Sequence, residues 1–141
     1  MREIEFRGKD STGIMNHDWF YGSLDTSFNE DFPRIICKDK WGNTMLITVD
    51  GETVGQYTGQ KDKFEKKIFE GDILSSLYKD DGCMGVYVIT FDNGAFYPKR
   101  YGKHQQIYVR VSMTDLKWCE VIGNIHDNPE LLTHQHEDKG E

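Results

Sequence analysis

Glycines and lysines are concentrated between residues 55 and 74, GQYTGQKDKFEKKIFEGDIL, a composition that phosphate-binding loops share. A phosphate loop needs glycines that lead directly into a helix whose N-terminus faces the anion. Here Gly55 and Gly59 lead into charged residues and a second β-like run, and the spacing fits neither GxGxxG nor the Walker pattern. The segment therefore predicts a hairpin with an exposed polar loop from Lys61 to Lys67.

Residues that commonly perform catalysis or bind metals are scattered along the chain. The chain has three cysteines, Cys37, Cys83 and Cys119. None of them forms a CxxC or CxxH pair, the spacing that begins many zinc sites. His134 and His136 lie in a segment, 133–141, that we expect to be a flexible acidic tail. No nucleophile accompanies His17-Asp18. We therefore predict that the protein is not an enzyme and has neither a metal nor a cofactor.

Aromatic and basic residues alternate after Phe96, and we single out five as candidate binding residues: Lys99, Arg100, Tyr101, Lys103 and Arg110. A platform for single-stranded nucleic acid uses rings to stack on bases and cations to bind phosphates. The alternative is a loop whose rings pack inward while its lysines are solvated. Because the net charge of −7 opposes attraction to a polyanion, weak nucleic-acid binding is our second hypothesis.

Phe64 stands among the lysines of the 61–67 loop. An aromatic side chain at a loop tip exposes apolar area unless another molecule covers it. Phe64 is therefore our first candidate for the anchor of a protein partner or of a second copy of this chain. Our first hypothesis is a non-enzymatic protein-interaction module that binds through Phe64 and exposed strand edges.

Bulky residues at every second position predict an all-β fold. We expect a small SH3-like barrel with additional N-terminal strands and a short C-terminal helix, in a single domain over residues 1–132. An alternative is that residues 1–50 form an appended layer on a barrel that starts at residue 53. The turn signal Asp92-Asn93-Gly94 predicts a hairpin whose pairing ends at Pro98, and Asn128 is expected to cap the terminal helix.

Several segments resemble the YopX family: VGQYTG at 54–59, KDK at 61–63, IFEGDI at 68–73 and EVIGNIHDNPELL at 120–132. MREI at 1–4 and WFYG at 19–22 also resemble the beginning of that family's sequences. This resemblance implies a β-rich protein of phage or prophage origin, and it supplies no catalytic residue. The family commonly has Asn-Gly between its tip lysines, where this chain has Phe64-Glu65. We therefore expect a wider loop there than a tight two-residue turn.

Neither a membrane span nor a signal peptide is predicted. The chain has no apolar run of about 18 residues, and its first residues alternate charged and bulky side chains. We expect a cytoplasmic protein, in the host cell if a phage encodes it, with no membrane partner.

Overall fold

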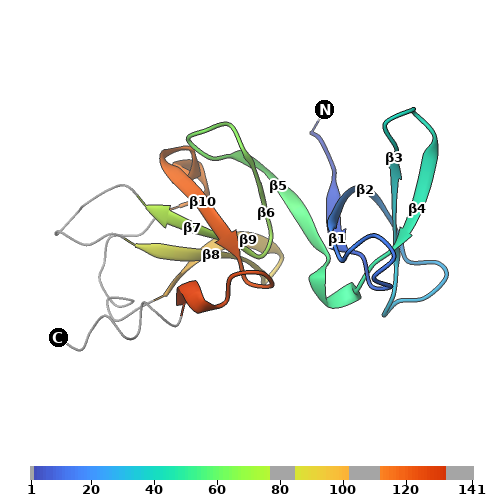
Figure 1. The fold of residues 1–141 in the computed structure, drawn as a ribbon. Coiled ribbons are helices and arrows are strands. Elements are labelled where there is room, and N and C mark those ends of the chain that lie inside the picture. The colour runs from blue at the N-terminus through green and yellow to red at the C-terminus, as the bar shows by residue number, and fades with distance from the viewer. Residues whose placement is uncertain (1, 77–84, 102–111, 133–141) are drawn as a thin grey trace. The chain divides into compact units, whose positions relative to one another are not determined.

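The computed structural model describes residues 2–76, 85–101 and 112–132 (Figure 1). The chain divides into two compact units, residues 1–57 and 58–141, which we describe separately. The single domain predicted for residues 1–132 stays a prediction. Several residues discussed above lie outside the described part: Cys83, Lys103, Arg110 and the tail 133–141.

The first unit is built on an antiparallel sheet. Its elements are β1 (Phe6–Lys9), β2 (Trp19–Asp25), β3 (Arg34–Lys38), β4 (Thr44–Thr48), the 3-10 turn η1 (Gly51–Thr53) and the start of β5 (Gly55–Lys61). The strand order is β4-β3-β2-β1-β5, and β5 continues to β6 (Lys67–Phe69).

Ile35 and Val49 are fully buried in the first unit. A Cβ atom at Gly8 would lie 2.8 Å from Val49 Cγ2, so only glycine lets β1 approach that side chain so closely. The core of this unit is therefore small and depends on a close backbone approach.

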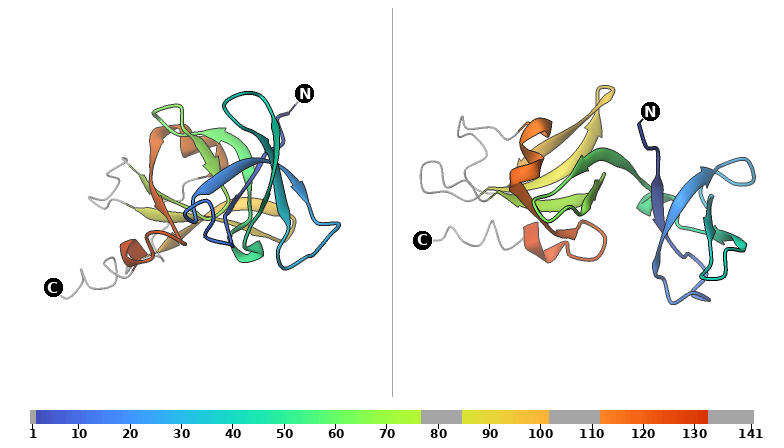
Figure 2. Two further views of the ribbon diagram at one scale, coloured as in Figure 1. Left: turned by 45° about the vertical axis from the view of Figure 1, so that its right-hand side comes forward. Right: turned by 90° about the horizontal axis from the view of Figure 1, so that it is seen from above.

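A four-stranded antiparallel sheet forms the second unit, in the order β10-β7-β8-β9 (Figures 1 and 2). Its strands and the 3-10 helix that precedes the last of them are β7 (Asp72–Ser76), β8 (Val86–Asp92), β9 (Ala95–Tyr101), η3 (Met113–Trp118) and β10 (Cys119–Asn124).

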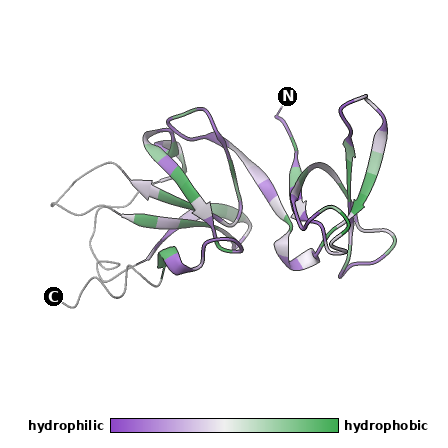
Figure 3. Ribbon diagram, in the orientation of Figure 1, coloured by the Kyte–Doolittle hydropathy of each residue, from purple (hydrophilic) through white to green (hydrophobic). Residues whose placement is uncertain are grey.

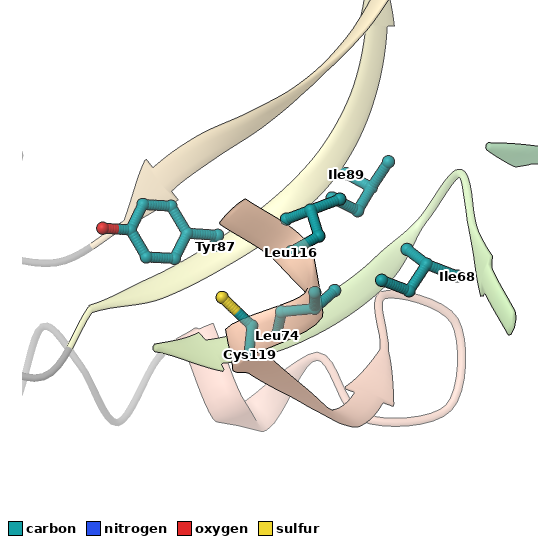
Figure 4. Packing of buried hydrophobic residues seen from close by; sticks show 6 residues of the cluster. All are labelled: Ile68, Leu74, Tyr87, Ile89, Leu116 and Cys119. Carbon is teal, nitrogen blue, oxygen red and sulfur yellow. The ribbon is translucent and has the colours of Figure 1, made fainter. Parts of the chain in front are cut away.

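Buried side chains form two clusters in the second unit. Figure 4 shows the larger cluster, made of Ile68, Leu74, Tyr87, Ile89, Leu116 and Cys119. The smaller cluster is made of Ile73, Val86 and Val88, against which Tyr101, Leu131 and Leu132 pack. Neighbouring residues of β7 and β8 belong to different clusters, because successive side chains of a strand point to opposite faces. The sheet is therefore covered on both faces, and Figure 3 shows hydrophobic residues along β8 and β10.

The all-β prediction is confirmed, because the strands of the described residues form two antiparallel sheets and only a few of those residues are helical. Neither sheet closes on itself over the described ranges, so the SH3-like barrel is not confirmed. Residues 130–132 are helical, as expected. The side chain of Asn128 nevertheless turns back to accept a hydrogen bond from Asn124 N at 3.2 Å.

Pro98 does not end the β8–β9 pairing, so that prediction was wrong. It lies opposite Ile89, and β9 continues to Tyr101. The Ile89 carbonyl accepts from Gly71 N at 2.8 Å, on the other side of β8, so Ile89 and Pro98 form a pair that exchanges no hydrogen bonds. A proline is tolerated there because the N–H that it lacks would point away from β8. Lys99, Arg100 and Tyr101 consequently lie in a strand and not in a loop.

Candidate interaction surface

The tip of the β5–β6 hairpin is organised by the carboxylate of Asp62. Its Oδ1 accepts hydrogen bonds from Phe64 N at 2.8 Å and Lys66 N at 2.9 Å, while Asp62 N donates to Lys66 O at 2.8 Å. Glu65 has a left-handed φ of 67°. This is a three-residue loop, in which a turn is followed by a left-handed residue. The expectation of a loop wider than a two-residue turn is confirmed.

Asp62 is only 3% exposed, so the prediction that residues 61 to 67 are all exposed was wrong at this position. Its second carboxylate oxygen accepts from Val121 N at 3.0 Å, and Lys63 N donates to Cys119 O at 2.9 Å. A buried carboxylate must find such partners, and these come from β10. The hairpin tip is therefore fixed to β10 by hydrogen bonds at two consecutive residues, Asp62 and Lys63.

These contacts bring two exposed aromatic residues near each other. The hydrogen bond from Lys63 N to Cys119 O joins the neighbours of both rings: Phe64 follows Lys63, and Trp118 precedes Cys119. Figures 1 and 2 show the tip next to η3 and the start of β10. Phe64 is 63% exposed and Trp118 is 49% exposed. Local sequence patterns gave no reason to select Trp118.

One lysine lies close to each ring. Lys63 Nζ lies 4.8 Å from the centroid of the Phe64 ring, and Lys117 Nζ lies 5.2 Å from that of Trp118. We call this region the tip surface and define it by six exposed residues: Phe64, Trp118, Lys61, Lys63, Lys66 and Lys117. The acids within it are the exposed Glu65 and the half-buried Glu120, since Asp62 is used internally. The tip surface is therefore basic, although the chain is acidic overall.

Three of the candidate binding residues after Phe96 lie in the described part of the chain, Lys99, Arg100 and Tyr101, and they are divided between the two faces of β9. Lys99 Nζ lies 5.5 Å from the ring centroid of Tyr101, two residues along the same face. Arg100 points to the opposite face, where its Cζ lies 5.8 Å from the ring centroid of the buried Tyr87. Lys99 and Arg100 therefore do not share one platform.

Parts of three strand edges in the described residues are closed to an added strand. On the β10 side the tip of the β5–β6 hairpin occupies the edge, and on the β9 side Pro98 removes a donor. In the first unit, Ser11 N donates to Thr48 O at 3.1 Å, beside the end of β4. Binding by strand addition is consequently less favoured than binding by exposed loops.

Cys119 is buried in the larger cluster. Burial, with the carboxylates of Asp115 and Asp62, raises the pKa of its thiol to about 11. A protonated thiol is neither a nucleophile nor a metal ligand at neutral pH. Over the described ranges, no three His, Cys, Asp or Glu side chains are grouped as metal ligands would be. Within the same ranges, no helix has the length and apolar character needed to cross a membrane.

Comparison with known proteins places the chain among relatives. The crystal structure of protein EF1440 from Enterococcus faecalis is similar, with a TM-score of 0.55 and 24% identity over 94% of this chain and 99% of that one. At this identity the likeness concerns the fold alone. No curated protein matches the chain. The family model described as YopX protein matches residues 5–133, nearly the whole chain. The chain therefore belongs to the YopX family, as its motifs suggested.

Proposed function

We propose that this protein is a non-enzymatic protein-interaction module and that the tip surface binds its partner. The observation that carries the proposal is an exposed aromatic residue on a loop held in place by hydrogen bonds. Phe64 N is bound by a buried carboxylate, and the same carboxylate binds β10. A partner therefore meets a preorganised loop and loses less free energy to ordering it. Aromatic anchors ringed by polar residues are typical of the centres of protein interfaces.

Nucleic-acid binding is the second candidate. It is supported by rings and lysines that lie together on the tip surface, as in a single-strand platform. It is disfavoured by the net charge and by the separation of Lys99 from Arg100 on β9. A gel shift with single- and double-stranded oligonucleotides at about 50 mM salt, where electrostatic binding is strong, tests it directly.

The biological setting is also part of the proposal. The family resemblance supports a phage or prophage gene, and a place in the cytoplasm of the host cell is consistent with a reduced, buried Cys119. A closed barrel is not required for this function, because the tip surface is built from one hairpin, η3 and β10.

Photo-crosslinking in cells that express the full chain tests the proposed function. Phe64 is replaced by p-benzoylphenylalanine, and the matched control carries the same residue at Trp41. Trp41 is also an exposed aromatic at a hairpin tip, with Lys40 Nζ 4.7 Å from its ring centroid. We expect discrete protein adducts from position 64 that position 41 does not give. Adducts to nucleic acid, or equal adducts from both positions, would contradict the proposal.

A further inference from the structure

Two segments of the first unit, 26–33 and 49–53, meet at one end of its sheet. Val49 N donates to Pro33 O at 2.9 Å, and Gly51 N donates to Asp31 O at 2.9 Å. The loop 10–18 precedes β2 and the segment 26–33 follows it, so the loop 10–18 lies at the other end of that strand. The surface at this end is therefore formed by 26–33 and 49–53, which are distant in sequence.

The segment 26–33 is also fixed from within. The side-chain oxygen of Asn29 accepts hydrogen bonds from Asp31 N at 2.9 Å and Phe32 N at 3.3 Å. Asp25 Oδ1 accepts from Ser27 N at 2.9 Å and from Ser27 Oγ at 2.6 Å. The loop around Phe28 is therefore ordered before any partner arrives, as the hairpin tip is in the second unit.

This end of the unit combines exposed apolar side chains with acids. Phe28 is 79% exposed and Phe32 is 49% exposed. We call this region the acidic end and define it by five exposed residues: Phe28, Phe32, Glu30, Asp31 and Glu52. Arg34 Cζ lies 5.5 Å from the ring centroid of Phe28, but its Nη2 is 2.7 Å from Asp25 Oδ2, so its charge is offset.

The acidic end and the tip surface are complementary. Each presents large apolar side chains among charged residues, and the net charges have opposite signs: three acids on the acidic end, and four lysines against Glu65 and Glu120 on the tip surface. Opposite charges around apolar anchors favour association and set its orientation. Both surfaces occur on every copy of the chain.

We propose that the acidic end of one copy docks on the tip surface of a second copy. This inference rests on the proposed function, because it names the partner of the tip surface. The contact joins two different patches, so it is heterologous, and each bound copy still offers one free surface of each kind. Association is therefore open-ended or closes into a ring, and salt weakens it.

Two double variants test whether the acidic end binds the tip surface. Each variant reverses charge on one of the two surfaces and leaves the other unchanged. Lys63→Glu with Lys117→Glu reverses charge on the tip surface, and Glu30→Lys with Glu52→Lys reverses charge on the acidic end. All four side chains are exposed, so the fold should be retained, and circular dichroism checks this. Mass is measured by light scattering with the full chain at about 200 µM and about 50 mM salt, conditions that reveal weak, charge-assisted contacts.

We expect the mass of the unmodified chain to rise above 16.4 kDa with concentration. Each double variant alone should stay at 16.4 kDa. An equimolar mixture of the two should rise above the monomer mass, because the acidic end of one variant meets the tip surface of the other and the two reversed surfaces are also complementary in charge. A mixture that stays monomeric, or a double variant that associates alone, overturns the inference. If position 64 then still crosslinks to a different protein, the proposed function stands and only the identity of its partner is wrong.

Discussion

The carboxylate of Asp62 accepts three backbone hydrogen bonds, from Phe64, Lys66 and Val121. In Asp62→Ala these three donors lose their acceptor in a largely buried place. Leaving a buried polar group unpaired costs about 1–3 kcal/mol, and water reaches part of this loop. We expect a loss of about 2–3 kcal/mol in the free energy of unfolding, measured with urea.

Asp62→Asn is the matched control, because it keeps one acceptor oxygen and nearly the same volume. It should lose about half as much stability as the alanine variant, since a neutral acceptor binds amides less strongly than a carboxylate. Equal stability of all three proteins would show that the tip does not depend on these bonds, and the preorganised loop would lose its support.

Acid should weaken the first unit through two aspartates. Burial would raise the pKa of Asp10, but hydrogen bonds from Thr12, Met15 and His17 outweigh it and lower that pKa to about 2. Hydrogen bonds from Ser27, together with Arg34, lower the pKa of Asp25 to about 2. The folded protein therefore binds fewer protons than the unfolded chain between the ordinary value of 3.8 and about 2.

The stabilisation from these two groups is thus complete above about pH 4 and is lost as the pH falls toward about 2. Urea unfolding at pH 7, 4 and 2.5 measures it. In Asp10→Asn the drop in stability between pH 4 and 2.5 should be smaller than in the unmodified chain, because one titrating group is gone. An unchanged drop would remove Asp10 as a cause.

At the scale of elements, the β5–β6 hairpin carries a residue that its turn does not favour. Glu65 has a φ of 67°, a region that costs a residue with a Cβ about 1 kcal/mol and costs glycine little. Glycine loses more entropy on folding, which offsets part of the gain. We expect Glu65→Gly to raise the free energy of unfolding by about 0.5 kcal/mol.

Glu65→Ala is the control for Glu65→Gly, because it removes the same charge and keeps the Cβ. Only the glycine variant should be stabilised in parallel thermal melts. A stabilised alanine variant would assign the effect to charge and not to backbone conformation.

Elements determined by adjacent residues could be predicted from the sequence. Asp92-Asn93-Gly94 formed the expected hairpin, because Asn93 and Gly94 both accept the positive φ of its turn, 52° and 80°. Pro98 was misread because its effect depends on whether its N–H would face β8, which residue type alone does not decide.

The candidate site was less predictable, since its geometry comes from contacts between distant segments. Phe64 was selected from its place in a polar loop, whereas the bond from Val121 N to Asp62 spans 59 residues. The family-like motifs also meet across the sheet. Asn124 pairs with Asp72, and Ile125 N donates to Gly71 O at 2.9 Å. These motifs therefore have a structural role, joining β10 to β7.

At the scale of the whole molecule, the two units differ in the size of their cores. Among the described residues, the fully buried apolar side chains of the first unit are Ile35 and Val49, while the second unit has two buried clusters. Both aspartates with lowered pKa values also lie in the first unit. Less buried apolar area gives a lower free energy of local opening.

We therefore expect hydrogen exchange in the native protein to be faster in β3 and β4 than in β7 and β8, by tenfold or more for about 1.4 kcal/mol of difference in opening free energy. Ile35→Val should accelerate exchange in residues 1–57 and leave β7 and β8 nearly unchanged, while Ile73→Val should act on the second unit. Each change removes one buried methylene, at a cost of about 1 kcal/mol. If either variant accelerated exchange equally in all four strands, the chain would open as one cooperative body. The strand β5, which borders β1 at its start and β6 at its end, would then be the element that couples the two units.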